Sequence, residues 1–250
     1  MKVQWDVCGD QMVNLGGDDK ANYVARMFDR IAQRYDRLNA VMSLGMHHYW
    51  RGQLAKLASS GIYGEALDIA TGTGDSAIAL LKQSNVTRVI GLDFSSGMLG
   101  FAREKVKGKG LAETLDLIEG DALRLPFGND IFSCVTIAWG LRNLADYSAG
   151  LREMVRVVKS GGRVAILDMT PLGVPKLLRG PFRWYFHHVT PLLGRWLANE
   201  REAYAYLPDS VDVFPDAEKL RDLMIECGMQ DVKFSYCGFG TQALHIGTVI

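Results

Sequence analysis

The chain has 250 residues, of which 48% are hydrophobic, and its 28 basic and 28 acidic side chains give a formal net charge of zero. A chain of this length fits one α/β domain with additions, and it can bury a core without disulfides or structural metals. Balanced charge argues against bulk nucleic-acid binding, which usually requires a basic excess. The sequence has no apolar run of about 18 residues, so we expect no membrane span.

The cysteines and the N-terminal residues indicate the compartment. Cys8, Cys134, Cys227 and Cys237 show no C-x-x-C spacing, and no apolar signal segment opens the chain. We therefore expect reduced thiols in a cytoplasmic protein, with no disulfide framework and no metal site.

Two helices are predicted before the first strand. Residues 1–19 are polar and are expected to be poorly ordered. From Lys20 onward, apolar residues recur at intervals of three and four, which indicates one face of an amphipathic helix: Val24, Phe28, Ile31, Tyr35 and Leu38. A second helix is expected from His48 to Ser59. We assign residues 1–60 to an N-terminal tail and helical lid, and residues 61–250 to the main domain.

Strands and helices then alternate. The sequence predicts strands at 66–70, 87–92, 114–118, 131–139 and 163–168, and helices at 75–83, 96–107 and 146–158. Repeated β-α-β units favour a parallel sheet covered on both faces, the Rossmann-like α/β class. Residues 171–214 form an aromatic-rich helical insertion, and a helix follows at 216–227. Two closing strands, near 231–237 and 242–249, are joined by Gly238-Phe239-Gly240, so the last of the seven strands should be antiparallel.

The most informative stretch is residues 66–75, ALDIATGTGD. A buried strand leads into a turn at Gly72 and Gly74 that allows a ligand to approach the backbone. The turn also satisfies a loose dinucleotide fingerprint, and Asp93 follows near the spacing which that fingerprint requires. Asp68, however, would repel a pyrophosphate and suits a ligand with an ammonium group, as in S-adenosylmethionine.

Two further acids follow strands. Asp93 ends a buried strand and can accept hydrogen bonds from ribose hydroxyls, which NAD and S-adenosylmethionine both have. Alternatively, it merely caps the helix that begins near Ser95. Asp121 and Ala122 follow the next strand. Three acids at three successive strand ends match the amino group, ribose and base of one nucleoside.

Two long motifs resemble the ubiquinone/menaquinone C-methyltransferase family. They are residues 35–50 (YDRLNAVMSLGMHHYW) and 156–170 (RVVKSGGRVAILDMT), with Gly140-Leu141-Arg142-Asn143 between them. The resemblance extends from about Tyr23 to the C-terminus. The chain departs from the family at four positions: Leu38 replaces a methionine, Asp168 a glutamate and Thr170 a serine, and Ala138 stands where some members have a cofactor-contacting serine.

The resemblance implies a class I fold with a mostly parallel seven-stranded sheet, and methyl transfer from S-adenosyl-L-methionine to a ring carbon of a polyprenylated quinol. Demethylmenaquinol is the expected substrate, and the benzoquinol precursor of ubiquinone is the alternative. In such enzymes the acid at Asp121 reaches the adenine amino group, and the next backbone N–H serves a ring nitrogen. The cofactor-binding residues are expected to be Asp68, Gly72, Thr73, Gly74, Asp93, Asp121, Ala122 and Ala138.

The catalytic residues that we expect are Arg142, Asn143, Tyr35 and Asp36. Arg142 follows a buried strand and would stabilise the phenolate; the alternative is a surface arginine paired with Asp146. Asn143 would orient a water molecule or cap the next helix. Tyr35 would hydrogen-bond a quinol oxygen from the lid, or simply pack there.

The remaining substrate-binding residues are expected to be His47, Tyr204 and Tyr206, besides Tyr35 and Arg142. His47 or His48 can transfer protons near neutral pH, although a histidine satisfied by backbone at a helix start fits equally well. The reaction needs no metal, and no cluster of His, Asp and Glu with ligand spacing is apparent.

Residues 171–199 contain no Asp or Glu, but have basic side chains among many aromatic ones. This composition suits peripheral contact with an anionic membrane surface, where an isoprenoid quinol resides; alternatively, the aromatic residues form the roof of the substrate pocket. A homodimer is possible. Competing functions are methylation of another small aromatic, including O-methylation, an NAD(P) oxidoreductase, and a non-catalytic S-adenosylmethionine-binding scaffold in a quinone-synthesis complex.

Overall fold

The computed structural model describes residues 17–170, Gly173, Gly180 and 201–250. The predictions for residues 1–16, and for most of the segment 171–200, lie outside the described residues. The side chains of a few residues near Asp19 and at 201–205 are likewise not described.

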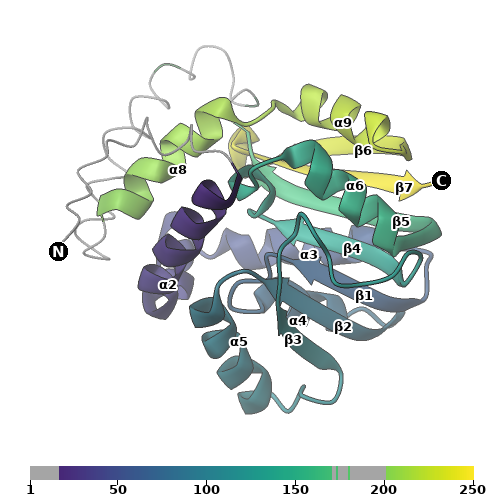
Figure 1. Ribbon diagram of the computed structural model, residues 1–250, viewed down its shortest axis with the longest axis horizontal. Coiled ribbons are helices and arrows are strands. Elements are labelled where there is room, and N and C mark those ends of the chain that lie inside the picture. The colour runs from purple at the N-terminus through teal and green to yellow at the C-terminus, as the bar shows by residue number, and fades with distance from the viewer. Residues whose placement is uncertain (1–16, 171–172, 174–179, 181–200) are drawn as a thin grey trace.

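The centre of the molecule is a seven-stranded sheet in the order β3-β2-β1-β4-β5-β7-β6 (Figure 1). Its strands are β1 (Gly64–Ile69), β2 (Val86–Asp93), β3 (Leu115–Glu119), β4 (Phe132–Ala138), β5 (Val158–Met169), β6 (Met229–Cys237) and β7 (Gln242–Val249). The first five pair in parallel, and β7 is antiparallel to both β5 and β6. The predicted Rossmann-like sheet with an antiparallel last strand is therefore confirmed.

Helices cover both faces of this sheet (Figure 1). On one face, α3 (Met46–Ser59), α4 (Asp75–Leu81) and α5 (Ser96–Gly108) pack on side chains such as Ala66 and Val89. On the other, α6 (Tyr147–Val157) and α9 (Ala217–Glu226) pack on the alternate side chains, such as Leu67 and Ile137. Because both faces are buried, the inner strands are apolar nearly throughout, and β4 is buried over its first six residues.

The N-terminal helix α2 (Gly17–Met42) lies across the ends of the strands, beside α5 and α8 (Arg201–Val213) (Figure 1). Its apolar face has the predicted period. Ile31 and Leu38 pack with Met27 and Ala32 against Met98 of α5 and Tyr206 of α8. The helix begins at Gly17, three residues before the predicted start.

The largest error in the predicted elements is at β5, which begins at Val158 rather than at 163. Phe132 pairs with Val158 and Cys134 pairs with Arg163, so four residues bulge out of the ladder between them. Gly161, with φ of 77°, accommodates that bulge. Sequence periodicity does not show such a bulge, because the extra residues are polar or glycine.

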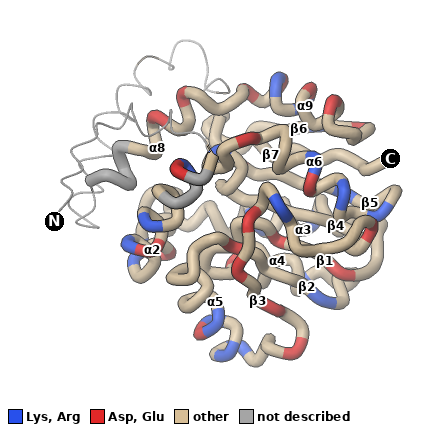
Figure 2. Tube along the Cα trace, in the orientation of Figure 1, with Lys and Arg blue, Asp and Glu red and all other residues tan. Residues whose placement is uncertain are grey.

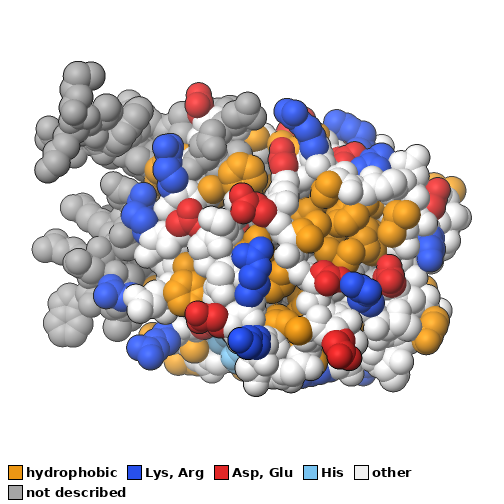
Figure 3. Space-filling view, turned by 60° about the horizontal axis from the view of Figure 1, so that its bottom comes forward, with side chains coloured by type: hydrophobic (Ala, Val, Ile, Leu, Met, Phe, Trp, Pro, Cys, Tyr) orange, Lys and Arg blue, Asp and Glu red, His pale blue; other side chains and the backbone are white. Residues whose placement is uncertain are grey.

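Charge is distributed evenly over the described elements (Figure 2). On the face shown in Figure 3, basic and acidic side chains are interspersed around apolar areas, so that face has no continuous basic surface. Within the described residues, no helix has both the length and the apolar character that crossing a bilayer requires.

Candidate functional site

A cavity of about 800 Å³, including its open mouth, lies where β1, β2, β3 and β4 end and α2 passes over them. This is the carboxyl edge of the parallel strands, where ligands bind in open α/β sheets. Seven of the residues predicted for the site line it: Tyr35, Gly72, Asp93, Asp121, Ala122, Ala138 and Asn143.

Asp93 is held rigidly at the end of β2. Its Oδ2 accepts a hydrogen bond from the Gly72 N–H at 2.7 Å, and its Oδ1 accepts one from the Ser95 N–H at 2.9 Å. The helix cap is Ser95, whose hydroxyl accepts from the Met98 N–H, so Asp93 is not the cap. Burial raises the pKa of Asp93. The carboxylate is thus fixed against the glycine turn and faces the cavity.

Asp121 is oriented in a similar way. Its Oδ1 accepts from the Leu123 N–H at 2.8 Å, and Ala122 beside it is buried. Both residues line the cavity at the end of β3, next to Leu92 and Asp93 of β2. Two carboxylates and an apolar wall are therefore presented to the same ligand.

The floor of the cavity is a close approach between two strand ends. A Cβ on Gly140 would lie 2.4 Å from the Ala70 Cβ, so only glycine fits there. Ala70 (φ 52°) and Trp139 (φ 56°) both adopt left-handed backbone, as Gly72 and Gly74 also do. Non-glycine residues in this region are strained, and such strain concentrates at functional sites.

Asp68 lies below the cavity rather than in its wall. It is fully buried, and its carboxylate accepts hydrogen bonds from the hydroxyls of Thr71 and Thr136, each at 2.7 Å. Burial raises its pKa to about 6, against the effect of these two hydroxyls and of Arg51. Its assignment to the ammonium group stays a prediction.

Arg142 is buried and forms an ion pair with Asp168. Nη1 lies 2.7 Å from Asp168 Oδ1, and the Arg142 backbone N–H donates to Oδ2 at 3.2 Å. Burial opposes the charge, but Asp168 offsets this and raises the pKa of the guanidinium. The alternative partner Asp146 is wrong, because Asp146 instead caps α6 by accepting from the Ala149 N–H.

Asn143 reaches the cavity from the 3-10 helix Leu141–Asn143. Its amide donates to the Trp139 carbonyl at 3.2 Å and accepts from the Tyr206 hydroxyl at 3.3 Å. Asp146 caps the next helix, so a capping role for Asn143 is wrong. Burial raises the pKa of Tyr206, which keeps its hydroxyl protonated as a donor. The side chain of Tyr204 is not among those described, and its role stays a prediction.

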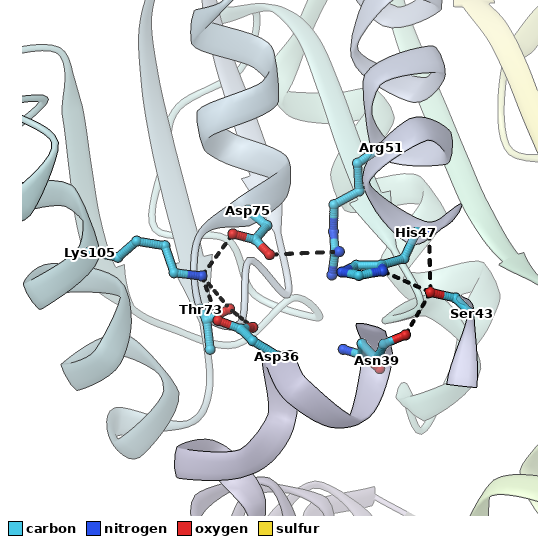
Figure 4. A network of polar contacts seen from close by, with 8 residues as sticks. All are labelled: Asp36, Asn39, Ser43, His47, Arg51, Thr73, Asp75 and Lys105. Atoms are coloured by element: carbon cyan, nitrogen blue, oxygen red, sulfur yellow. Dashed lines mark hydrogen bonds and ion pairs between the residues drawn. The ribbon is translucent and has the colours of Figure 1, made fainter. Parts of the chain in front are cut away.

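Tyr35 and Asp36, neighbours on α2, point to different partners. Tyr35 lines the cavity and packs edge-on against Phe28. Asp36 instead accepts from the Thr73 hydroxyl at 2.6 Å and from Lys105 Nζ at 2.7 Å, and Lys105 also bonds Asp75 at 2.7 Å (Figure 4). Asp36 and Thr73 therefore connect the lid helix to the glycine turn and α5 without lining the cavity.

His47 is buried at the start of α3 and does not line the cavity. Its Nδ1 lies 2.7 Å from Ser43 Oγ, and burial together with Arg51 lowers its pKa to about 4, so the ring is neutral. Potential ligand atoms of His47, His48 and Asp75 lie within 4.8 Å of one another, a cluster that spacing along the chain did not indicate. Arg51 and Lys105 both face Asp75, and this positive charge disfavours a cation.

Three residues of the site were not predicted in these roles: Asp168, Lys105 and Trp139. Asp168 lies in the second motif, and its position at a strand end beside β4 was the available signal. Lys105 lies in α5, outside the motifs along the chain, and no sequence signal pointed to it.

Comparison with known proteins agrees with this geometry. A family model described as the ubiE/COQ5 methyltransferase family matches residues 17–249. The chain belongs to this family. It is therefore a methyltransferase.

Relatives in the ubiE/COQ5 methyltransferase family match over most of their length. The demethylmenaquinone methyltransferase of Deinococcus radiodurans is 42% identical over 92% of this chain and 93% of the relative. Those of Roseiflexus castenholzii and Thermus thermophilus are 40% and 41% identical, over 92% and 88% of this chain and 94% and 99% of theirs.

Solved structures support the fold. A Thermotoga maritima protein described as an S-adenosylmethionine-dependent methyltransferase, possibly acting on histamine, superposes with a TM-score of 0.62 at 18% identity, over 90% of this chain and 98% of that one. A Methanococcus maripaludis methyltransferase gives a TM-score of 0.61 at 20% identity, over 89% and 94% of the two chains.

Proposed function

We propose that this enzyme transfers a methyl group from S-adenosyl-L-methionine to a ring carbon of demethylmenaquinol, giving menaquinol. The observation that carries the proposal is the match to demethylmenaquinone methyltransferases over most of both chains, combined with a cavity lined by Asp93 and Asp121. The methyl donor, when bound, supplies an activated methyl on a sulfonium, so the protein's task is alignment and activation of the acceptor carbon.

The residues present fit this donor. Asp93 and Asp121 offer carboxylate oxygens at neighbouring strand ends for the ribose and the adenine amino group, and Leu92, Met98 and Ala122 give the base an apolar wall. In this proposal Gly72 and Ala138 make only backbone or van der Waals contact, because neither has a polar side chain.

Quinol activation is assigned to two polar side chains of the cavity wall. Asn143 and Tyr35 both line it, and their amide and hydroxyl groups can hydrogen-bond a quinol oxygen. Arg142 lies beside Asn143 and adds positive charge, and its buried Nε has no hydrogen-bond partner among the described residues. Positive charge next to a quinol hydroxyl favours the phenolate, which makes the adjacent ring carbon more nucleophilic.

The quinol's isoprenoid tail requires access to a bilayer. The acid-free, aromatic and basic composition of residues 171–199 supports peripheral contact with an anionic membrane. Flotation with anionic vesicles, compared with neutral vesicles, tests this contact. Equal recovery of the protein with both vesicle types contradicts it. Preference for the naphthoquinol over the benzoquinol is a part of the proposal that rests on the names of the relatives.

The decisive experiment is incubation of the purified enzyme with donor carrying a labelled methyl group and a short-chain demethylmenaquinol. We expect label in the quinone fraction, with a methyl chemical shift that identifies a C-methyl group. An O-methyl product would assign another aromatic methyltransferase reaction, and no label would contradict the proposal. The matching benzoquinol, run in parallel, tests substrate preference.

A variant assigns the role of Arg142. Arg142→Lys keeps a positive charge but loses the planar array of donors. We expect donor affinity to be unchanged and turnover to fall roughly tenfold or more. Arg88→Lys, on the exposed ion pair with Asp116, is the matched control. Unchanged turnover in Arg142→Lys would remove Arg142 from quinol activation.

A further inference from the structure

Arg51 is a buried cation without an adequate partner. The residue lies on α3 and is 6% exposed. Its Nε and Nη1 have no hydrogen-bond partner among the described residues. The nearest carboxylate oxygen, Asp75 Oδ2, lies 3.8 Å from Nη1, which is too long for a hydrogen bond. Buried donors almost always have partners, so an acceptor is missing here.

Packing provides a partner for the flat face of the Arg51 guanidinium but not for the N–H groups at its edge. The Arg51 Cζ lies 4.8 Å from the centroid of the Trp139 ring, a cation–π contact. This stacking uses the flat face of the group. The N–H donors point outward in its plane, and those on Nε and Nη1 have no partner among the described residues.

The neighbouring anions are already engaged. Asp75 Oδ1 bonds Lys105 Nζ at 2.7 Å, and Asp68 accepts from two threonine hydroxyls. The ring beside Arg51 is His47, which is neutral because its pKa is lowered (Figure 4). Among the described residues, no acceptor therefore lies within hydrogen-bond distance of Arg51 Nε or Nη1, and these charged donors favour a small anionic ligand.

The position of Arg51 indicates which anion this is. Trp139, on which it stacks, lines the cavity, and Asp75 follows directly after the glycine turn. The same turn donates the Gly72 N–H to Asp93, where the ribose is placed in the proposed function. Arg51 and Asp93 thus border the two sides of one turn, and a nucleoside bound at Asp93 would extend its other end toward Arg51.

We propose that Arg51 binds the carboxylate of the amino-acid end of S-adenosylmethionine, opposite the ammonium group that is assigned to Asp68. The inference rests on the donor site of the proposed function.

The test uses a ligand that differs only in this group. Decarboxylated S-adenosylmethionine keeps the sulfonium, the ribose, the base and the ammonium, but lacks the carboxylate. Titration calorimetry should show that the wild-type protein prefers S-adenosylmethionine by roughly 10- to 100-fold, the factor expected for hydrogen bonds to charged groups. In Arg51→Met this preference should vanish, while affinity for the decarboxylated ligand stays at the wild-type value.

Two matched variants identify the cation responsible. Lys105→Met removes the other cation beside Asp75, which is only partly buried, and Arg88→Met removes an exposed arginine. Both should retain the wild-type preference. A preference that survives in Arg51→Met, or one lost in Lys105→Met alone, overturns the proposal. Equal weakening of both ligands in Arg51→Met also overturns it, because that result marks a merely structural role.

Folding controls distinguish a variant that does not fold from one that has lost its ligand preference. Circular dichroism and thermal melting check the folding of each variant. If Arg51→Met does not fold, Arg51→Lys replaces it, and its preference for S-adenosylmethionine over the decarboxylated ligand must then be lower than that of the wild-type protein. If the wild-type protein binds both ligands equally, this inference fails while donor binding stands. If quinol methylation fails, the proposed substrate is wrong, and the ligand preference still decides the role of Arg51.

Discussion

Asp68 shows how burial adjusts one carboxyl group to its site. It is fully buried, and the hydroxyls of Thr71 and Thr136 replace water around it. Because burial disfavours the charged form, its pKa rises from 3.8 to about 6. The group is therefore mostly ionised at neutral pH but close to its titration point, and this affects stability.

The sign of the stability effect follows from proton linkage. Between its unfolded pKa of 3.8 and its folded pKa of about 6, Asp68 binds more protons in the native state. The contribution of Asp68 to the free energy of unfolding is complete below its unfolded pKa and is lost as pH rises through its folded pKa. Relative to Asp68→Asn, the wild-type free energy of unfolding should fall by about 3 kcal/mol from pH ~3.5 to pH ~7. Urea denaturation across this range measures it; a pH-independent difference contradicts the assignment.

The Arg142–Asp168 pair predicts a second effect on stability. Arg142→Ala leaves the Asp168 carboxylate, which is 2% exposed, without its cation. We expect the free energy of unfolding to fall by about 3–5 kcal/mol. Arg142→Ala combined with Asp168→Asn, which removes the unpaired charge and keeps one acceptor oxygen for a backbone N–H group, should recover part of this loss. A fall below about 1 kcal/mol for Arg142→Ala would show that the pair contributes little.

At the scale of single residues, the sequence predicted where the acidic residues lie better than it predicted which residues they contact. The acids at 68, 93 and 121 stand at strand ends because the apolar strand pattern locates those ends. Whether an acid faces the cavity or lies below it depends on neighbours such as Thr136, which is 68 residues from Asp68 along the chain. The ion pair of Arg142 with Asp168 joins residues 26 apart, and no local pattern encodes it.

At the scale of elements, α2 is held to the body by two carboxylates. Asp36 bonds Thr73 and Lys105, and Asp29 accepts from the Ser95 hydroxyl and the Gly97 N–H at α5. Apolar periodicity predicted this helix and its buried face. It did not predict these anchors, because they come from the polar face, which sequence analysis reads as exposed to solvent.

A pair of glycines on α5 tests the anchoring of α2. A Cβ on Gly97 would lie 2.6 Å from Asp29 Oδ1 and 3.3 Å from the Asp29 Cα, whereas one on Gly100 would meet nothing within 4 Å. Gly97→Ala should push α2 off α5 and speed hydrogen exchange in residues 20–38, leaving the sheet unchanged. Gly100→Ala should be neutral or stabilising by about 0.5–1 kcal/mol. Equal rates of hydrogen exchange in α2 of Gly97→Ala and Gly100→Ala would contradict this role of Gly97.

At the scale of the whole molecule, the sheet protects its centre. Cys134 lies in β4, between β1 and β5, and is 1% exposed. Burial raises the pKa of its thiol to about 12, while Cys237, at the sheet's edge, is partly exposed. In the native protein a thiol reagent should label Cys237 first and Cys134 only at the rate of global unfolding. Mass spectrometry of the labelled peptides measures this; simultaneous labelling of both would indicate local opening of β4.

The relative direction of the strands was the most predictable property of the molecule. Repeated β-α-β units predicted the parallel half of the sheet, and the short Gly238–Gly240 link predicted the antiparallel end. The β5 bulge was not predictable, because polar residues within a strand carry no period. The bulge does not disturb the site, since it lies at the opposite edge of the sheet from the cavity.

The contact between Ala70 and Gly140 leaves room for a single methyl group between two strand ends. Ala70 bears that methyl in left-handed backbone, whereas Gly140, with φ of −104°, could bear one without backbone strain. Exchanging the pair, Ala70→Gly with Gly140→Ala, should therefore be tolerated after a small shift of Ile137, although Gly140→Ala alone would not. Residues 70 and 140 are therefore expected to vary together or not at all, because the space beneath the cavity holds only one methyl group.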